Sequence, residues 1–151
     1  MEQRKNSVLV ALNDSVSSRW VLDFLCTMSL SPEDWKISLV HFYKEPSASE
    51  DLMGKKFTEK QPEKMKKLLQ RARKRLIESG YHPDRIECRL ITDPHPTIAD
   101  GIIDQAKKGH ATMVIIGRKK MSKAEEFVKG DISVKLVRAL EGTAVLVVKS
   151  L

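Results

Sequence analysis

Short apolar runs alternate with segments of helical periodicity along the whole chain. Five runs rich in Val, Ile and Leu have the length of β-strands, at residues 7–12, 36–42, 86–91, 112–116 and 143–148. Strands that alternate with helices form a mostly parallel sheet, and right-handed crossovers place the helices on both of its faces. We therefore predict a single α/β domain over residues 1–151, with a doubly wound, five-stranded parallel sheet.

Between the strands, apolar side chains recur three and four positions apart, as they do on one face of a helix. This spacing predicts helices over 15–28 and 132–140, a basic helix that includes 63–76 and ends near Gly80, and a helix from Ile98 to Gly109. The segment 44–61 has no clear periodicity and is rich in polar residues, so it predicts a long connection that is either mobile or a lid.

The amino-acid composition and the expected cellular location add little to this predicted fold. Apolar residues make up 41% of the 151 residues and charged residues 31%, which is ordinary for a globular protein. No apolar run approaches the roughly 20 residues that span a bilayer, and the polar N-terminus leads directly into a strand, so we expect a cytoplasmic protein. Cys26 and Cys88 lack partners at metal-ligand spacing and are predicted to be small buried side chains, with no metal bound.

The formal net charge of +7 raises the question of nucleic-acid binding. Much of this charge lies on the helix 63–76, whose apolar residues form the opposite face, so a solvated helix surface explains it. No aromatic residues interleave with the cations, and nucleic-acid binding is therefore not expected. The alternative is a polyanion binder that depends on Lys66, Arg71 and Arg75 and weakens steeply with salt.

Candidate chemistry lies where strands end, because ligands of parallel sheets bind beyond the carboxyl ends of the strands. The segment 117–133 follows a buried strand and opens a helix, and its cations outnumber its carboxylates. Backbone N–H groups at such a helix start can bind an anion, although an exposed basic loop would have the same sequence. His41 is predicted to be a hydrogen-bonded core residue, and His95 a surface-loop residue, because no carboxylate or Cys stands at ligand spacing from it.

Four segments resemble the universal stress protein family in order and spacing: residues 8–15, the strand that ends in His41 and Phe42, 113–118 and 143–148. The resemblance implies a Rossmann-like sheet of the adenine nucleotide alpha hydrolase-like type and a regulatory role in the stress response, with a protein partner still to be named. It also implies a homodimer that pairs the last strand, Ala144 to Val148. An apolar strand at a sheet edge invites such pairing.

ATP-binding members of that family carry a glycine, two residues, a second glycine, nine residues, and a third glycine followed by Ser or Thr. Gly117 and Gly130 match the first and third glycines, whereas Lys120 replaces the second glycine and Asp131 replaces the hydroxyl residue. Asn13 stands where ATP-binding members usually have an aspartate. The resemblance implies ATP or AMP as ligand, with Mg²⁺.

These departures have physical consequences. A lysine lacks the backbone freedom of glycine, and the Asp131 carboxylate can cap the helix and repel a phosphate unless Mg²⁺ bridges the two. We expect Asn13 and Phe42 on the adenosine side, Gly117 and Gly130 as loop-shaping residues, and Ser133 as a hydroxyl donor. Cations at Arg118, Lys119 and Lys120 would supply a positive field.

The resulting expectation is a homodimeric regulatory binder, not an enzyme, with weak or absent adenine nucleotide binding. The alternative on the same scaffold is a slow, Mg²⁺-dependent ATP hydrolase or an adenylate-forming enzyme, whose turnover would depend on Asp131. The sequence contains neither a nucleophile elbow nor a phosphate-binding loop with the Lys-Ser/Thr signature.

Overall fold

The computed structural model describes the backbone of residues 6–43, 55–125 and 131–150, with side chains described from residue 62 onward in the second of these segments. Five parallel strands form one sheet in the order β3-β2-β1-β4-β5. The strands are β1 (Asn6–Ala11), β2 (Trp35–Phe42), β3 (Ile86–Ile91), β4 (Met113–Arg118) and β5 (Ala144–Lys149). The helices are α1 (Val16–Met28), α3 (Lys55–Glu78), the short 3₁₀ helix η1 (Pro83–Arg85), α4 (Ile98–Lys108) and α6 (Ile132–Ala139).

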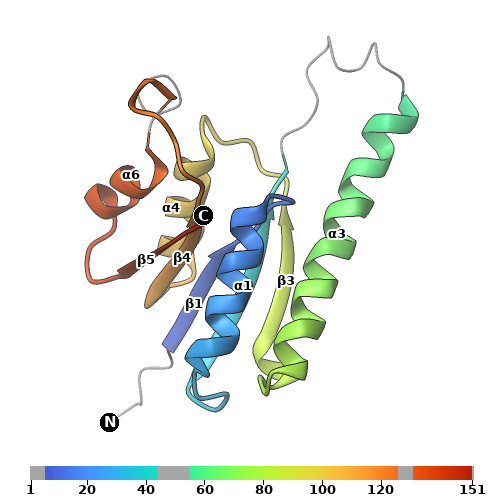
Figure 1. The fold of residues 1–151 in the computed structure, drawn as a ribbon, viewed down its shortest axis with the longest axis vertical. Helices are drawn as coiled ribbons and strands as arrows, with labels where there is room; N and C mark the ends of the chain where they lie inside the picture. The colour runs from blue at the N-terminus through green and yellow to red at the C-terminus, as the bar shows by residue number, and fades with distance from the viewer. Residues whose placement is uncertain (1–5, 44–54, 126–130, 151) are drawn as a thin grey trace.

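Helices cover both faces of the sheet, α1 and α3 on one and α4 and α6 on the other (Figure 1). The central strand β1 shows why two cores form, because successive side chains of a strand point to opposite faces. Val8 and Val10 pack under α1 and α3, whereas Leu9 packs toward α4 and α6, and all three are at most 3% exposed. The strand order reverses between β1 and β4, which places a crevice at their carboxyl ends.

Tyr81, in the connection from α3 to β3, holds the C-terminal end of α1 in place. Its hydroxyl donates a hydrogen bond to the Leu25 carbonyl (2.5 Å) and accepts one from the Leu30 amide (3.1 Å). The last carbonyl groups of a helix have no partner within the helix. A buried tyrosine supplies one here, and burial raises the pKa of its phenol above the ordinary value.

The predicted fold class and all five strands are confirmed, but one predicted boundary is wrong. The helix α3 begins at Lys55, so the last part of the segment expected to be irregular is helical and includes Pro62. A proline and an absence of apolar periodicity both argue against a helix, which is why the pattern hid this one. The prediction of a mobile segment or lid falls on residues 44–54, outside the described residues.

Two smaller predictions can also be compared with the structure. Within the described part of the chain, no helix is long and apolar enough to cross a membrane. Cys26 and Cys88 are both free thiols and are half-buried rather than fully buried; the Cys88 thiol contacts the Leu69 carbonyl oxygen at 3.4 Å.

Candidate functional site

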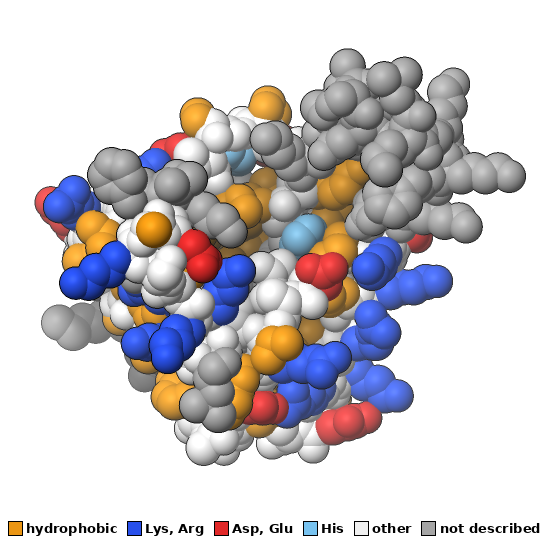
Figure 2. Space-filling view, turned by 45° about the horizontal axis from the view of Figure 1, so that its top comes forward, with side chains coloured by type: hydrophobic (Ala, Val, Ile, Leu, Met, Phe, Trp, Pro, Cys, Tyr) orange, Lys and Arg blue, Asp and Glu red, His pale blue; other side chains and the backbone are white. Residues whose placement is uncertain are grey.

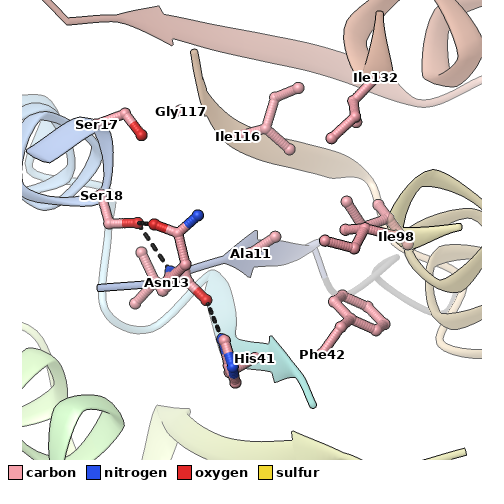
Figure 3. Close-up of a pocket in the computed structure, with 12 residues that line it drawn as sticks. Ala11, Asn13, Ser17, Ser18, His41, Phe42, Ile98, Ile116, Gly117 and Ile132 are labelled. Carbon is pink, nitrogen blue, oxygen red and sulfur yellow. Dashed lines mark hydrogen bonds between the residues drawn. The ribbon is translucent and has the colours of Figure 1, made fainter. Parts of the chain in front are cut away.

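A crevice of about 100 Å³ lies at the carboxyl ends of β1, β2 and β4 (Figure 3). The first residues of α1, α4 and α6 close around it, because every helix that follows a parallel strand begins at this edge of the sheet. Its lining residues are Ala11, Leu12, Asn13, Ser17, Ser18, His41, Phe42, Ile98, Ile102, Ile116, Gly117 and Ile132. Three residues predicted for the site, Asn13, Phe42 and Gly117, are therefore brought together.

Asn13 is held rigidly at the end of β1. Its side-chain oxygen accepts hydrogen bonds from the Ser15 amide and the Ser18 hydroxyl, both at 2.9 Å, and from the Ser15 hydroxyl. The backbone N–H of Asn13 donates a hydrogen bond to the Ser18 hydroxyl oxygen at 2.9 Å. Because the oxygen is used internally, the side-chain NH₂ is the group that Asn13 offers to a ligand (Figure 3). It can donate to a sugar oxygen, where an aspartate could only accept.

Gly117 has a packing role that the motif did not reveal. A Cβ atom at this position would lie 2.8 Å from the Ser17 carbonyl oxygen and 3.0 Å from the Ser17 Cβ. The first turn of α1 therefore packs directly on the end of β4, an approach that only glycine permits. Gly117 fixes the distance between α1 and β4, which sets the width of the crevice.

Phe42 forms the wall of the crevice opposite α1. A Cβ atom on Gly101 of α4 would lie 2.8 Å from two carbons of the Phe42 ring, so this glycine makes room for the aromatic side chain. The His95 ring meets Phe42 edge-on, with centroids 6.3 Å apart. Beyond Phe42 the crevice continues into a hollow of about 580 Å³ between Tyr43 and the loop before α4, which gives the site the room that a small-molecule ligand requires.

His95 lies in the loop before α4, as predicted, but it is half-buried and has a carboxylate partner. Its Nε2 lies 3.3 Å from Asp104 Oδ2, and its Nδ1 lies 2.9 Å from the Asp93 carbonyl oxygen. This partner, Asp104, lies within α4, nine residues further along the chain, and was not recognisable from local spacing. The hydrogen bond from Lys108, and then the one from His95, lower the pKa of the Asp104 carboxyl. The cluster orients the His95 ring that supports Phe42.

Two isoleucines at the mouth of the crevice are exposed despite being apolar. Ile98 begins α4 and is 53% exposed, and Ile132 begins α6 and is 39% exposed. Both point toward the space above Phe42 (Figure 3). Apolar side chains at the mouth of a pocket with a few fixed polar groups are typical of sites that hold a planar or partly apolar ligand.

At the start of α6, the protein's own carboxylate occupies the position suited to an anion. Asp131 is the N-cap residue, and its Oδ1 accepts a hydrogen bond from the Ser133 amide at 3.0 Å. Its Oδ2 lies 3.1 Å from the Arg118 guanidinium. The Ser133 hydroxyl, and then the Arg118 charge, hold the pKa of the Asp131 carboxyl below its ordinary value. Asp131 thus uses an N–H group and a cation that a phosphate would need.

The other residues predicted for the site do not line the crevice among the described residues. The Ser133 hydroxyl donates to Asp131 and is buried, so it does not face the crevice as predicted. Lys119 and Lys120 are exposed after the end of β4. Gly130 lies outside the described residues.

Several crevice residues were missed by sequence reasoning. Ser17 and Ser18 follow Asn13 closely, and a cluster of serines after an asparagine at a strand end is a turn signal that could have been recognised. His41 is hydrogen-bonded as predicted, with Nδ1 2.8 Å from the Leu12 carbonyl oxygen, but it is half-buried and lines the crevice.

The fold is that of a doubly wound α/β protein with a crevice at its topological switch point, which is where ligands of such sheets usually bind. The family model described as the universal stress protein family matches residues 5–149. The chain therefore belongs to the universal stress protein family.

Solved structures agree with this assignment at the level of the fold. A universal stress protein in complex with cAMP has a TM-score of 0.68 at 18% identity, over 97% of this chain and 98% of that chain. A universal stress protein from Lactobacillus plantarum has a TM-score of 0.70 at 12% identity, over 97% and 99% of the two chains. One from Archaeoglobus fulgidus, in complex with dAMP, has a TM-score of 0.59 at 19% identity, over 95% and 98%. A search of curated proteins finds no match.

Proposed function

We propose that this protein is a homodimeric regulatory module of the stress response that binds adenine nucleotides weakly through their adenosine part. The observation that carries the proposal is the Asp131 carboxylate, which caps α6 and pairs with Arg118 at 3.1 Å. The crevice offers the NH₂ group of Asn13 and apolar walls at Phe42 and Ile98. Two family structures that contain cAMP and dAMP support adenine nucleotides as the ligand class.

The proposed nucleotide binding is weak because a phosphate would have to compete with the Asp131 carboxylate at the start of α6. A phosphate that bound there would have to displace the Asp131 carboxylate from both the helix N–H and the Arg118 guanidinium. Loss of a helix cap costs about 0.5–2 kcal/mol, and loss of a partly exposed ion pair costs about 0.2–1 kcal/mol. The combined penalty of about 1–3 kcal/mol weakens binding by about 5- to 150-fold.

Binding without catalysis is part of the proposal. His41, which lines the crevice, uses its Nδ1 on a backbone carbonyl, and no described carboxylate contacts its ring. Among the described residues, no three His, Cys, Asp or Glu side chains come together as a metal site. The Asp131 carboxylate, which Mg²⁺ would need at the start of α6, is already engaged by Arg118 and Ser133. We expect no Mg²⁺-dependent ATP hydrolysis above the rate in buffer; turnover that disappears in Asp131→Ala would favour the hydrolase alternative.

Calorimetric titration with adenosine, AMP and ATP, each with and without Mg²⁺, tests the ligand proposal. We expect adenosine and AMP to bind, and ATP to bind more weakly than about 10 μM, which corresponds to about 7 kcal/mol. ATP binding tighter than this would show that Asp131 is no obstacle. No binding of adenosine or AMP at millimolar concentration would refute the adenosine site.

The homodimer is proposed through the edge strand β5, Ala144 to Val148. Strand β5 ends the sheet, so one side of its backbone has no strand partner among the described residues. Apolar side chains flank it on both faces. Trp20 and Phe24 are 37% and 41% exposed on the side of α1 turned away from α3, and Val134 and Val137 are 43% and 63% exposed on α6.

Sedimentation equilibrium tests this interface. We expect a dimer for the wild-type protein and a monomer for Trp20→Glu or Val137→Glu, because a charge in a buried apolar interface is strongly unfavourable. Lys67→Glu introduces the same side chain on the exposed face of α3 and should leave the dimer intact. A monomeric wild-type protein would refute the interface.

A further inference from the structure

A second hollow, of about 500 Å³, lies between α1 and α3 and has not been used by the proposed function. Its inner surface is apolar and includes Leu22 of α1 and Leu68 and Ala72 of α3. Its rims are basic, and Figure 2 shows Lys and Arg side chains gathered along the α3 flank of the molecule. We call this hollow the α1–α3 groove.

The charges on the two rims do not cancel. Arg75 of α3 pairs with Asp23 of α1, and Lys64 lies 3.7 Å from Asp14. Arg19 from α1 and Arg71 from α3 also line the groove, and neither has an acidic partner in the part of the chain that the structure describes. Two guanidinium groups from opposite walls therefore leave the groove with a positive charge that the protein itself does not neutralise.

The basic residues of α3 are divided between two faces of the helix. Lys64, Arg71 and Arg75 recur at helical spacing with the apolar residues that line the groove, so they face α1. Lys67 and Lys74 are exposed and do not line it. The groove cations are thus a structural subset of the basic helix, and the sequence alone did not separate them.

The groove and the crevice meet at the end of β1. Leu12, Asn13 and Ser18 line both of them. A ligand held in the crevice next to the Asn13 NH₂ group therefore lies beside the cationic groove, because Asn13 lines both. In the other direction, the start of α6 is occupied by the Asp131 carboxylate.

We propose that the phosphate chain of an adenine nucleotide passes over Asn13 and binds between Arg19 and Arg71, instead of at the start of α6. This inference rests on the proposed adenosine site and adds the location of the phosphates. Arginine suits this role because its planar guanidinium can donate two parallel hydrogen bonds to phosphate oxygens. The nearby Asp14 carboxylate is held by Lys64, which limits its repulsion of the phosphates.

Calorimetric titration of three single variants with ATP and with adenosine tests the inference. Arg19→Gln and Arg71→Gln should each weaken ATP binding on the order of tenfold, since each removes one charge-assisted contact. Adenosine binding should stay unchanged in both, because adenosine has no phosphate. Lys74→Gln removes the same charge from the outer face of α3 and should change ATP binding less than about twofold. Circular dichroism confirms that each variant is folded.

The outcomes separate the inference from the proposed function. If ATP binds the wild-type protein but Arg19→Gln and Arg71→Gln bind it equally well, the phosphates lie elsewhere and the inference is wrong, while the adenosine site stands. If Lys74→Gln weakens ATP binding as much as Arg71→Gln, the effect is general electrostatic attraction and the inference is also wrong. If neither adenosine nor ATP binds the wild-type protein, the proposed function fails and the inference fails with it.

Discussion

Replacement of Asp131 by serine should convert the start of α6 into a phosphate site. The substitution removes the carboxylate that pairs with Arg118 at 3.1 Å and restores the hydroxyl that the ATP-binding pattern has at this position. Serine is itself a favourable N-cap, so the helix should keep its first turn. The loss of a partly exposed ion pair should reduce stability by about 0.2–1 kcal/mol.

The expected gain in ATP affinity follows from the contacts that the carboxylate now makes. Asp131 accepts a hydrogen bond from the Ser133 amide at 3.0 Å and holds the Arg118 guanidinium. A phosphate no longer has to displace these interactions in the variant, which removes the penalty of about 1–3 kcal/mol derived above. In the Arg19→Gln/Arg71→Gln background, where the α1–α3 groove no longer competes for the phosphates, the dissociation constant for ATP should therefore fall by about 5- to 150-fold.

Calorimetry with ATP and adenosine provides the assay. Adenosine should bind Asp131→Ser and the wild-type protein equally, because it carries no phosphate. Asp84→Ser removes an exposed carboxylate from η1, far along the chain from the crevice, and controls for the change in net charge. If Asp131→Ser binds ATP no better than the Arg19→Gln/Arg71→Gln protein into which it is introduced, or if Asp84→Ser gives the same gain in that background, the Asp131 carboxylate is not the obstacle to phosphate binding.

Three further predictions concern stability and can be measured by urea denaturation. Tyr81→Phe should lower the free energy of unfolding by about 1–3 kcal/mol, because it leaves a buried carbonyl of α1 unpaired; no change would show that the hydroxyl is dispensable. Gly117→Ala should lower it by about 1–3 kcal/mol and weaken adenosine binding, since the new Cβ lies 2.8 Å from the Ser17 carbonyl oxygen; a fully stable variant would contradict the close approach. The lowered pKa of Asp131 stabilises the fold above the pKa of the unfolded chain, about 3.9, and this contribution is lost as the pH falls through the folded value. Asp131→Asn should therefore lose less stability than the wild-type protein as the pH falls below about 4, and parallel pH profiles would refute this assignment.

The sequence was sufficient for the architecture because each buried strand is a short apolar run. It was also sufficient to place Asn13, Phe42 and Gly117 in one site, since the carboxyl ends of neighbouring parallel strands meet at one edge. The length of α3 was underestimated because its first part is a polar segment with a proline and has no apolar stripe that would indicate a helix.

What the sequence could not supply are contacts between residues that are distant along the chain. The motif identified Asp131 as a departure, but its pairing with Arg118 depends on how α6 returns to β4. The room that Gly101 makes for Phe42 depends on the packing of α4. The α1–α3 groove joins Arg19 and Arg71, which no local pattern connects.

The close contact between Gly117 and Ser17 has a consequence for the proposed regulatory role. On its inner side, α1 presents Ser17 and Ser18 to the crevice, and on its outer side it presents Trp20 and Phe24 to the proposed partner subunit. Only the thickness of α1 separates the crevice from the proposed dimer interface. A ligand that displaced the end of β4 would also displace α1, because the backbone of Gly117 packs directly on Ser17 with no side chain between them. Occupancy of the crevice would then change the position of α1, and this change would reach the proposed partner subunit directly through Trp20 and Phe24.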